Sequence, residues 1–485
     1  MEGRDRLEEI PLDTDAHRTQ SRNVAQTGVG RVKEAARREK SARFTALLHH
    51  VDVAALERAF RRLQRHASAG VDGQTVASYE PELAARLQSL HNRLHAGTYR
   101  PQAARRVYIP KADGGERPLG ILVLEDKIVQ SAVAEVLSAV YEADFLGFSY
   151  GFRPGRSPHA ALVALREGMM TRYINWVLDA DIRSFFDTVD HEWLLRMVAH
   201  RIADPRIIRL IRMWLKAGVL EGGQWHESEQ GTPQGAGISP LLSNIFLHYV
   251  FDLWVQQWRR RTAKGRMIVV RYADDFVLGF QNEGDARRMR ADLEARLAQF
   301  GLSLHGDKTR LIEFGKFAAD QRRARGERRP ETFAFLGFTH FCGKTRDGRF
   351  TVKTKTDRRR MTRKLNELRA SLRARRHEPL AAQHTWLTRV LRGHDGYYGL
   401  AGNSRALHRF HRAVERAWRH VLNRRGSPHR MTWVRYFEIL RCFPLPPARI
   451  VHSPEALRAR FPSILGKSRV RESRMLGSVR EKPNG

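Results

Sequence analysis

Three aspartates are the first candidates for chemistry in this basic chain. Asp274 and Asp275 lie at the tip of an apolar hairpin pattern, residues 267–280, and Asp181 ends an apolar stretch, residues 175–182. Aspartate is common in turns, so the Asp274–Asp275 pair alone also suits a simple turn. If both segments share one sheet, three carboxylates meet at one edge and repel unless cations bind between them. Mg²⁺ prefers such oxygen ligands, and two Mg²⁺ ions can activate a hydroxyl and stabilise a leaving pyrophosphate, as in polymerases.

The composition indicates a polyanionic partner. The 485 residues include 86 Lys and Arg against 52 Asp and Glu, a formal net charge of +34, with 42% hydrophobic residues. Such a composition is typical of a folded protein that binds RNA, DNA or an anionic membrane. The two cysteines, Cys342 and Cys442, exclude a disulfide scaffold and a cysteine-rich zinc module. Without an 18-residue apolar run or a signal-peptide pattern, we expect a cytoplasmic protein that binds nucleic acid and no membrane.

Predicted strands and helices surround these aspartates. Residues 105–123 favour a strand, a turn and a second strand, and apolar spacing predicts helices at 126–141, 192–216, 240–258 and 284–300. Between Lys353 and Arg376 there are eleven Lys and Arg but only two acids. Apolar side chains at 361, 365, 368 and 372 predict an amphipathic helix there, with a heavily basic face.

A series of segments, in chain order, resembles motifs of group II intron reverse transcriptases. Tyr272-Ala273-Asp274-Asp275 resembles their YxDD box, residues 178–187 (LDADIRSFFD) resemble their first palm motif, and residues 230–240 (QGTPQGAGISP) resemble their QGxxQGxxxSP segment. The remaining matches, to the fingers, the last palm segments and the primer grip, are residues 109–111, 117–120, 151–157, 301–309 and 335–338. A YxDD box alone is weak evidence for this family, whereas the ordered set of matches over about residues 70–340 is specific evidence for it.

The resemblance implies roles for the acidic residues and one aromatic residue. Asp181, Asp274 and Asp275 would be catalytic and would bind two Mg²⁺ ions, with Mn²⁺ as an alternative ion. Asp179 shares a strand face with Asp181, and the motif alignment rather than the physics favours Asp181. Phe186 would exclude a ribose 2′-hydroxyl and so select dNTPs, although an ordinary core aromatic is the alternative.

Other residues would bind the nucleotide and the primer. Lys111 and Arg117 would hold the triphosphate as charge-assisted donors, with a solvated hairpin as the alternative. Gln234 and its neighbouring glycines would let the backbone approach the nucleotide or template. Lys308 would lie near the active site. It would either donate a proton to pyrophosphate as a general acid or be a basic residue there without that role. The primer grip would comprise Phe335, Leu336 and Gly337.

The resemblance also implies an α+β fold of the right-hand polymerase type. Fingers and a palm with an antiparallel sheet would precede a helical thumb and maturase domain. We expect a basic N-terminal tail at 1–43, fingers and palm at 44–345, thumb and maturase at 346–445, and a basic C-terminal tail at 446–485. The basic helix predicts RNA binding by Arg358, Arg359, Arg360, Arg363 and Lys364.

The expected function is RNA-directed DNA polymerisation from dNTPs on an RNA template and a DNA primer. The expected partners also include the parent group II intron RNA, whose splicing and mobility the protein would assist, and target DNA. No cysteine follows Cys442, so we expect no cysteine-rich endonuclease domain. A stand-alone enzyme in repair or defence and a non-enzymatic splicing factor are the alternatives, and the intact aspartates weigh against the latter. If the protein does not assist splicing, the region 353–440 would serve only as a thumb for the primer–template. The sequence does not indicate the oligomeric state.

Overall fold

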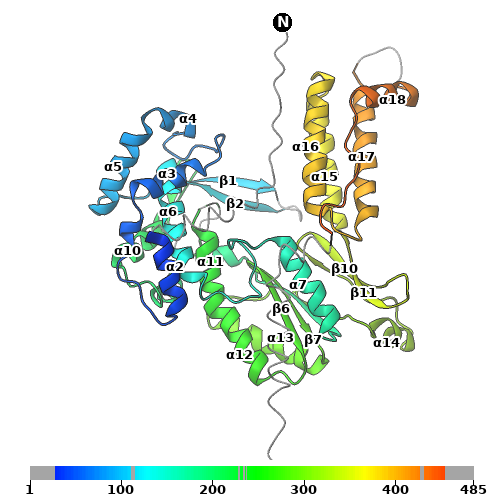
Figure 1. The fold of residues 1–485 in the computed structure, drawn as a ribbon, viewed down its shortest axis with the longest axis horizontal. Helices are drawn as coiled ribbons and strands as arrows, with labels where there is room; N and C mark the ends of the chain where they lie inside the picture. Colours follow the sequence, from blue (N-terminus) through cyan, green and yellow to red (C-terminus); the bar gives the residue numbers. More distant parts are fainter. Residues whose placement is uncertain are drawn as a thin grey trace, which may run out of the picture. The chain divides into compact units, whose positions relative to one another are not determined.

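The computed structural model describes residues 28–110, 115–227, 230–232, 235, 237–425 and 431–453 (Figure 1). The chain divides into two compact units. Unit 1 comprises Met1–Ile109, Pro118–Leu146 and Ser184–Leu253, and unit 2 comprises Pro110–Arg117, Gly147–Arg183 and Trp254–Gly485. The expected α+β class is confirmed, because each unit combines helices with a sheet. No helix in the described ranges is long and apolar enough to cross a membrane.

Unit 1 is mostly helical. Its longer helices outside the 192–216 region are α2 (Gly28–Arg38), α3 (Val53–Arg61), α5 (Leu83–His95), α6 (Leu124–Tyr141) and α11 (Ser239–Leu247). Its short turns of helix are η1 (Leu48–His50), α4 (Val76–Tyr79), η2 (Glu80–Glu82), α8 (Phe185–Thr188) and η3 (His248–Asp252). Both α2 and α3 pack against α6, whose Ile128, Val133 and Leu137 are fully buried. Helix α6 is therefore central to this unit.

A four-stranded sheet with the order β2–β1–β4–β5 belongs mainly to unit 1. Its strands are β1 (Ala104–Pro110), β2 (Glu116–Ile121), β4 (Val219–Glu221) and β5 (Gln224–His226). Strand β1 runs parallel to β4, with Ala104 opposite Val219, and β4 pairs antiparallel with β5. The predicted pair of strands within 105–123 is confirmed, and its turn at 111–114 lies outside the described residues.

The helical pattern predicted at 192–216 is confirmed, but as two helices with a break between them. The structure has two helices there, α9 (His191–Ala199) and α10 (Pro205–Lys216). Asp204 caps the second helix, and Pro205 occupies its first turn. Aspartate is a preferred N-cap, and proline suits the first helical position because its missing N–H has no partner to lose there. A helix start signal therefore interrupts an otherwise continuous apolar pattern.

The Asp204 carboxylate also anchors another segment of unit 1. It accepts hydrogen bonds from the backbone N–H groups of Leu47, Leu48 and Arg206 at 2.8, 3.1 and 3.0 Å. Burial alone would raise its pKa, but hydrogen bonds from the Arg206 side chain and from these backbone groups lower the pKa of Asp204 to about 2. This carboxylate therefore stabilises the fold as an anion.

Replacing Asp204 with alanine should destabilise unit 1 more than the loss of an ordinary helix cap. Asp204→Ala leaves buried N–H groups of Leu47 and Leu48 unpaired, at a cost of about 2–4 kcal/mol. Asp52→Ala is the matched control, since Asp52 caps α3 through one hydrogen bond from the Ala55 N–H, and it should cost about 1 kcal/mol. Chemical denaturation at pH 7 measures both losses, and equal losses would contradict this interpretation.

The difference between these two variants should shrink in acid. The folded-state pKa of Asp204 lies below its ordinary value of 3.8, so its stabilisation is present above that value. That stabilisation is lost as the pH falls through the folded pKa of about 2.

A four-stranded antiparallel sheet with the order β6–β7–β3–β8 organises unit 2. Its strands are β3 (Trp176–Asp181), β6 (Met267–Tyr272), β7 (Asp275–Phe280) and β8 (Arg310–Glu313). The predicted strand at 175–182 and hairpin at 267–280 are confirmed, and β3 and β7 are direct neighbours. Nearly all residues of β6 and β7 are buried, as expected for a sheet that is covered on both faces.

Helices cover both faces of this sheet. Helix α7 (Pro158–Thr171), capped by Ser157, packs against β6 and shares a core with Val177 and Val277. Helix α13 (Glu283–Ala298) packs against β3 and β7 with the apolar side chains that predicted a helix at 284–300. The pattern at 240–258 corresponds to α11, η3 and α12 (Leu253–Arg261).

A second antiparallel sheet in unit 2 has the order β11–β10–β9. Its strands are β9 (Phe333–Phe335), β10 (Phe338–Lys344) and β11 (Phe350–Thr356), and the short helix α14 (Ala318–Ala324) precedes them. The prediction of a helix from Lys353 is wrong at its start, because β11 continues to Thr356. Alternating Thr, Val and Lys favour a strand there, and Asp357 caps the helix that follows.

Four helices complete unit 2. They are α15 (Arg358–Ala374), α16 (Leu380–Tyr398), α17 (Ser404–Leu422) and α18 (Trp433–Cys442). Helix α17 packs against α15 and α16, and the three lie alongside one another (Figure 1). The predicted apolar positions 368 and 372 lie in their core with Leu391 and Trp418. The expected domain boundary at 345/346 falls in the β10–β11 turn, and most of both predicted tails lies outside the described residues.

Candidate active site

The pairing of β3 with β7 brings the predicted aspartates together in unit 2. Asp181 lies directly opposite Asp275, and Asp179 lies opposite Val277. Opposed residues in an antiparallel pair have Cβ atoms about 4.5–5.5 Å apart, and alternate residues share a face. Asp179, Asp181 and Asp275 therefore lie on one face at one end of the sheet, and Asp274 lies in the adjoining turn.

The turn that carries Asp274 is tight and strained. Tyr272 pairs with Asp275, so Ala273 and Asp274 alone connect β6 to β7. Ala273 has a φ of 56°, a left-handed conformation that is uncommon for a residue with a Cβ atom. The guanidinium of Arg271, fully buried, donates a hydrogen bond to the Ala273 carbonyl at 2.9 Å. This contact fixes the backbone that presents Asp274.

Residues 148–151 pass directly beside this turn, and we call this contact the Gly151 crossing. The Tyr150 N–H donates to the Arg271 carbonyl at 2.8 Å, and the Arg271 N–H donates to the Phe148 carbonyl at 2.9 Å. A Cβ atom at Gly151 would lie 2.3 Å from the Ala273 nitrogen, so only glycine fits there. Gly151 belongs to the matched segment 151–157, but its role beside the Asp274 turn was not predicted. Arg271 was not singled out, although its charge within an apolar strand pattern was an available signal.

Burial and mutual repulsion raise the pKa values of the carboxylates. Burial, followed by the charges of Asp179, Asp274 and Asp181, raises the pKa of Asp275 to about 8, against a smaller lowering by Arg360. Burial also raises the pKa of Asp179 to about 6, although Arg310 lowers it. Asp275 therefore holds a proton at neutral pH unless additional positive charge reaches the site.

Two basic side chains reach these carboxylates from β8 and the turn before it. Lys308 Nζ lies 3.3 Å from Asp181 Oδ2, and Arg310 Nη2 lies 3.5 Å from Asp179 Oδ2. The structure thus brings Lys308 to the aspartate that the motif alignment favoured. Arg310 was not singled out from the sequence, and its contact engages Asp179 rather than Asp181.

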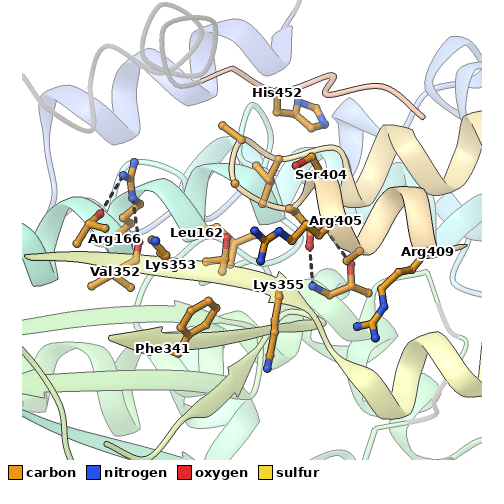
Figure 2. Close-up of a pocket in the computed structure, with 18 of the residues that line it drawn as sticks. Leu162, Arg166, Phe341, Val352, Lys353, Lys355, Ser404, Arg405, Arg409 and His452 are labelled. Atoms are coloured by element: carbon orange, nitrogen blue, oxygen red, sulfur yellow. Dashed lines mark hydrogen bonds between the residues drawn. The ribbon is translucent and has the colours of Figure 1, made fainter. Parts of the chain in front are cut away.

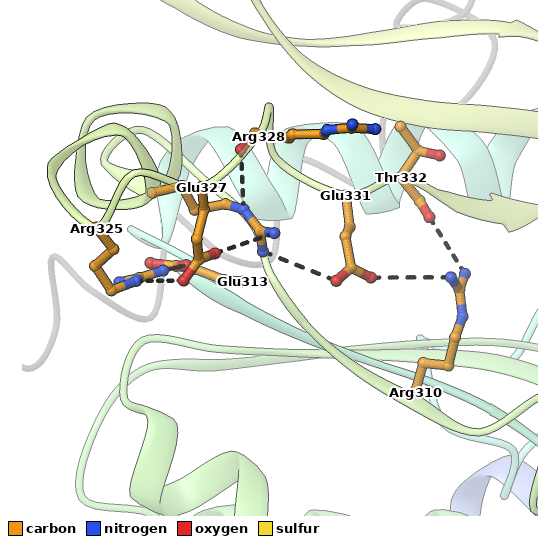
Figure 3. A network of polar contacts seen from close by, with 8 residues as sticks. Arg310, Glu313, Arg325, Glu327, Arg328, Glu331 and Thr332 are labelled. Carbon is orange, nitrogen blue, oxygen red and sulfur yellow. Dashed lines mark hydrogen bonds and ion pairs between the residues drawn. The ribbon is translucent and has the colours of Figure 1, made fainter.

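Arg310 is itself held by a chain of alternating charges (Figure 3). It donates to the Thr332 carbonyl at 3.2 Å and approaches Glu331 at 3.9 Å. The ion pairs continue from Glu331 through Arg322, Glu327 and Arg325 to Glu313. Exposed ion pairs are individually weak, but a network of this length limits how far each side chain moves. The network therefore holds Arg310 in its ion pair with Asp179.

The predicted primer-grip residues lie where β9 turns into β10: Phe335 ends β9, and Leu336 and Gly337 connect it to β10. Leu336 and Gly337 both have positive φ angles, 48° and 80°, as a tight two-residue turn requires. Tyr397 Oη donates to the Leu336 carbonyl at 2.9 Å. A Cβ atom at Gly337 would lie 3.1 Å from Tyr398 Oη and 3.3 Å from a guanidinium nitrogen of Arg360. This turn thus lies against α15 and α16 beside Arg360, whose charge lowers the pKa of Asp275.

The five predicted RNA-binding residues all lie on α15, and all are exposed. Arg363 and Lys364 approach Glu367 at 3.7 and 3.5 Å. Arg360, Arg363 and Lys364 line a hollow of about 460 Å³ with residues of α16, whereas Arg358 lines a different cavity. Arg359 lines neither.

The remaining predicted residues belong to other parts of the chain. Phe186 lies in unit 1, half-buried on α8, with its ring centroid 5.4 Å from that of Phe185. The Thr232 N–H donates to the Phe186 carbonyl at 2.7 Å, so the structure brings the QG segment beside this aromatic residue. Lys111 and Gln234 lie outside the described residues, and Arg117 lies on β2 with its side chain undescribed.

The donor set suits a divalent cation, although the described residues contain no group of three or more His, Cys, Asp or Glu side chains arranged to hold one. The oxygens of Asp181, Asp274 and Asp275 are the ligands that Mg²⁺ prefers. Burial, followed by the neighbouring carboxylates, raises the pKa of Asp275, and a divalent ion would supply positive charge to this cluster. In the structure Lys308 provides a positive charge 3.3 Å from Asp181 Oδ2.

Comparisons with known proteins define the class to which this fold and site belong. A family model described as reverse transcriptase (RNA-dependent DNA polymerase) matches residues 109–340. Protein YkfC of Escherichia coli (strain K12) is 39% identical over 277 residues, which cover 50% of this chain and 71% of that protein.

Two intron proteins extend the comparison. Group II intron-encoded protein LtrA of Lactococcus lactis subsp. cremoris is 38% identical over 193 residues, 40% of this chain and 31% of that protein. The putative COX1/OXI3 intron 1 protein of Saccharomyces cerevisiae is 28% identical over 312 residues, 54% of this chain and 37% of that protein. This chain thus matches about a third of the length of these two relatives. It belongs to the family of group II intron reverse transcriptases and maturases.

Enlarging Gly151 should displace the Asp274 turn and reduce DNA synthesis. Gly151→Ala places a Cβ atom against the Ala273 backbone, and a misplacement of about 1 Å in an active site can cost about 10²-fold in rate. Gly147→Ala is the matched control, because nothing lies within 4 Å of its added Cβ atom. Primer-extension rates on an RNA template measure both variants. Equal rates would mean that the Gly151 crossing does not position the turn.

Proposed function

We propose that this protein is an RNA-directed DNA polymerase that transfers nucleotides from dNTPs to a primer 3′-hydroxyl on an RNA template. The observation that carries the proposal is the opposition of Asp181 and Asp275 beside the strained Asp274 turn. Membership of a reverse transcriptase family supports the same conclusion. A structural turn alone would not explain why four carboxylates gather at one end of a buried sheet in a chain of net charge +34.

Asp181, Asp274 and Asp275 would hold two Mg²⁺ ions, with Mn²⁺ as an alternative. When bound, such ions activate an attacking hydroxyl and stabilise a leaving pyrophosphate. The strand pairing positions Asp181 and Asp275, and Arg271 holds the turn that presents Asp274. Lys308 Nζ lies 3.3 Å from Asp181 Oδ2 and would interact with the leaving group. Lys111, Arg117 and Gln234 would bind the dNTP.

The polymerase would have the right-hand arrangement of fingers, palm and thumb. The β6–β7–β3–β8 sheet would be the palm, and the helices that follow β11 would form the thumb. The turn with Phe335, Leu336 and Gly337 would grip the primer, because it contacts both the thumb helices and the region beside Asp275. The exposed cations of α15 would contact the template–primer and other RNA.

A group II intron RNA is the proposed natural partner, and assistance to its splicing and mobility at target DNA is the second proposed activity. Two relatives are named as intron proteins, and basic helices suit the backbone of folded RNA. If the protein is instead a stand-alone polymerase in repair or defence, the DNA that flanks its gene would not encode an intron RNA. A non-enzymatic splicing factor would bind RNA but extend no primer.

Removing one carboxylate should separate DNA synthesis from RNA binding. Asp274→Asn keeps the size of the side chain but removes its charge, so primer extension with Mg²⁺ should fall by at least about 10²-fold. RNA affinity should stay near that of the wild type, because the cations lie elsewhere. Asp320→Asn, an exposed change on α14, is the control and should leave both unchanged. Full extension by Asp274→Asn, or no extension by the wild type, would refute the proposed activity.

Phe186 provides an independent test through sugar selection. Phe186→Ala should reduce the preference for dNTPs over rNTPs by about tenfold or more, since the ring would no longer exclude the 2′-hydroxyl. Phe186→Tyr keeps the ring and should retain the preference. Single-nucleotide incorporation with matched dNTP and rNTP pairs measures the ratio. If Phe186 is only a core aromatic, the alanine variant will lose stability while its sugar preference stays unchanged.

A further inference from the structure

Unit 2 contains a large cavity that the proposed polymerase site does not use. Its volume is about 1200 Å³, and its lining comes from α7, the β10–β11 hairpin, α15, the start of α17 and His452 (Figure 2). None of the carboxylates or primer-grip residues is among the lining residues. The cavity is therefore distinct from the candidate active site.

The lining is strongly basic. It includes eight Lys and Arg side chains but one acid, Glu167. Arg166 donates hydrogen bonds to the Val352 carbonyl and Thr351 Oγ1. Part of its hydrogen-bonding capacity therefore stabilises the protein itself. Within the described part of the chain, Lys353, Arg405 and Arg409 form no ion pair. The cavity thus concentrates positive charge that the protein itself does not neutralise.

The position of Arg405 is electrostatically unfavourable for the fold. It lies in the first turn of α17, where the helix dipole already presents positive charge. The Asn403 side chain at this helix start is engaged with Thr356 and does not cap α17. The first N–H groups of α17 and Arg405 therefore add to the same positive field, which an anion in the cavity would relieve.

The cations follow two elements with a regular spacing. Lys353 and Lys355 lie two residues apart on β11, at the edge of its sheet, and Arg405 and Arg409 lie one turn apart on α17. Figure 2 shows the cationic ends of Lys353 and Arg405 between β11 and α17. Both spacings are about 6–7 Å. A strand of nucleic acid, which carries a phosphate on every residue, matches a series of cations better than a single small anion does.

The chemistry of the lining favours backbone contacts over base contacts. Thr351, Thr354 and Ser404 supply hydroxyl groups that can bond to phosphate or ribose oxygens. The one aromatic ring of the lining other than His452 is Phe341, and Lys355 Nζ lies 5.5 Å from its centroid. Sequence-specific recognition of single strands usually needs stacked bases. This lining therefore suits binding that is independent of sequence.

We propose that this cavity, which Arg358 of α15 also lines, binds the sugar–phosphate backbone of an RNA strand at a site separate from the polymerase centre. The inference rests on the proposed function, in which the protein binds a long structured RNA. The cavity would then hold a segment of that RNA while the carboxylate end of the palm sheet acts on the primer. Short primer–template duplexes would not need the cavity.

Lys353 and Lys355 have a competing explanation. Lysines on an edge strand prevent other strands from pairing with it, and β11 is an edge strand. That role would account for the lysines but not for Arg405 and Arg409 on α17. The test must therefore combine a strand residue with a helix residue.

The experiment compares Lys353→Gln/Arg405→Gln with the matched control Arg261→Gln/Arg288→Gln. Each double variant removes two positive charges, and the control residues are exposed on α12 and α13, outside the cavity. The affinity for a structured group II intron RNA is measured over a range of salt concentrations. Each lost phosphate contact with single-stranded RNA reduces the slope of log K against log[salt] by about 0.7.

The cavity variant should show a slope shallower by about 1.4 and an affinity about tenfold lower, whereas the control should match the wild type. Unrelated RNA sequences of equal length should show the same loss. Equal slopes in the cavity and control variants would overturn the proposal. So would a cavity variant that loses binding of inorganic tripolyphosphate but keeps the RNA slope, since this would indicate a small-anion site. A loss of solubility without a change in slope would assign the lysines to edge protection.

Primer extension on a short duplex separates this inference from the proposed function. The cavity variant should extend such a primer at the wild-type rate. If the wild type itself extends no primer, the polymerase proposal fails, and the salt dependence of RNA binding still decides the role of the cavity.

Discussion

The crowding of four carboxyl groups, only partly balanced by positive charge, at one end of the β6–β7–β3–β8 sheet is the constraint on which the candidate site depends. Backbone pairing fixes Asp275 opposite Asp181, so these carboxylates cannot separate without breaking the sheet. Burial and repulsion raise the pKa of Asp275 to about 8. The chain supplies Lys308 and Arg310 at the edge of this cluster, and both are partly exposed. A divalent cation is the natural complement of such an arrangement.

The surrounding structure holds the cluster against its own repulsion. Arg271 and the Gly151 crossing support the strained turn, and the ion-pair network around Arg310 engages Asp179. The Asp181 side chain remains more exposed than that of Asp179. The positive charge that we propose to bind nucleic acid lies on other elements, on α15 and around the cavity beside β11. The proposals therefore predict that catalysis and RNA binding can be altered separately.

Local signals predicted the parts of this site that depend on local structure. Apolar alternation and turn residues predicted the strand that ends at Asp181 and the hairpin that carries Asp274, because strand and turn preferences act over a few residues. The Gly151 crossing and the Arg310–Asp179 pair join segments far apart in the chain, and no periodicity encodes them. One error had a local cause: the lysines of β11 were assigned to the following helix although their alternation favoured a strand. The break before Asp204 within the helical pattern at 192–216 was not predicted, although Asp204 and Pro205 are a helix start signal.

The most direct test of the central claim is Mn²⁺ binding measured by electron paramagnetic resonance on the protein with primer–template and a non-hydrolysable dNTP. The wild type should bind Mn²⁺, and Asp181→Asn/Asp274→Asn should lose that binding while it still binds the nucleic acid. Equal Mn²⁺ binding by the wild type and the double variant would contradict the account, because the ion would then be held by groups other than these aspartates.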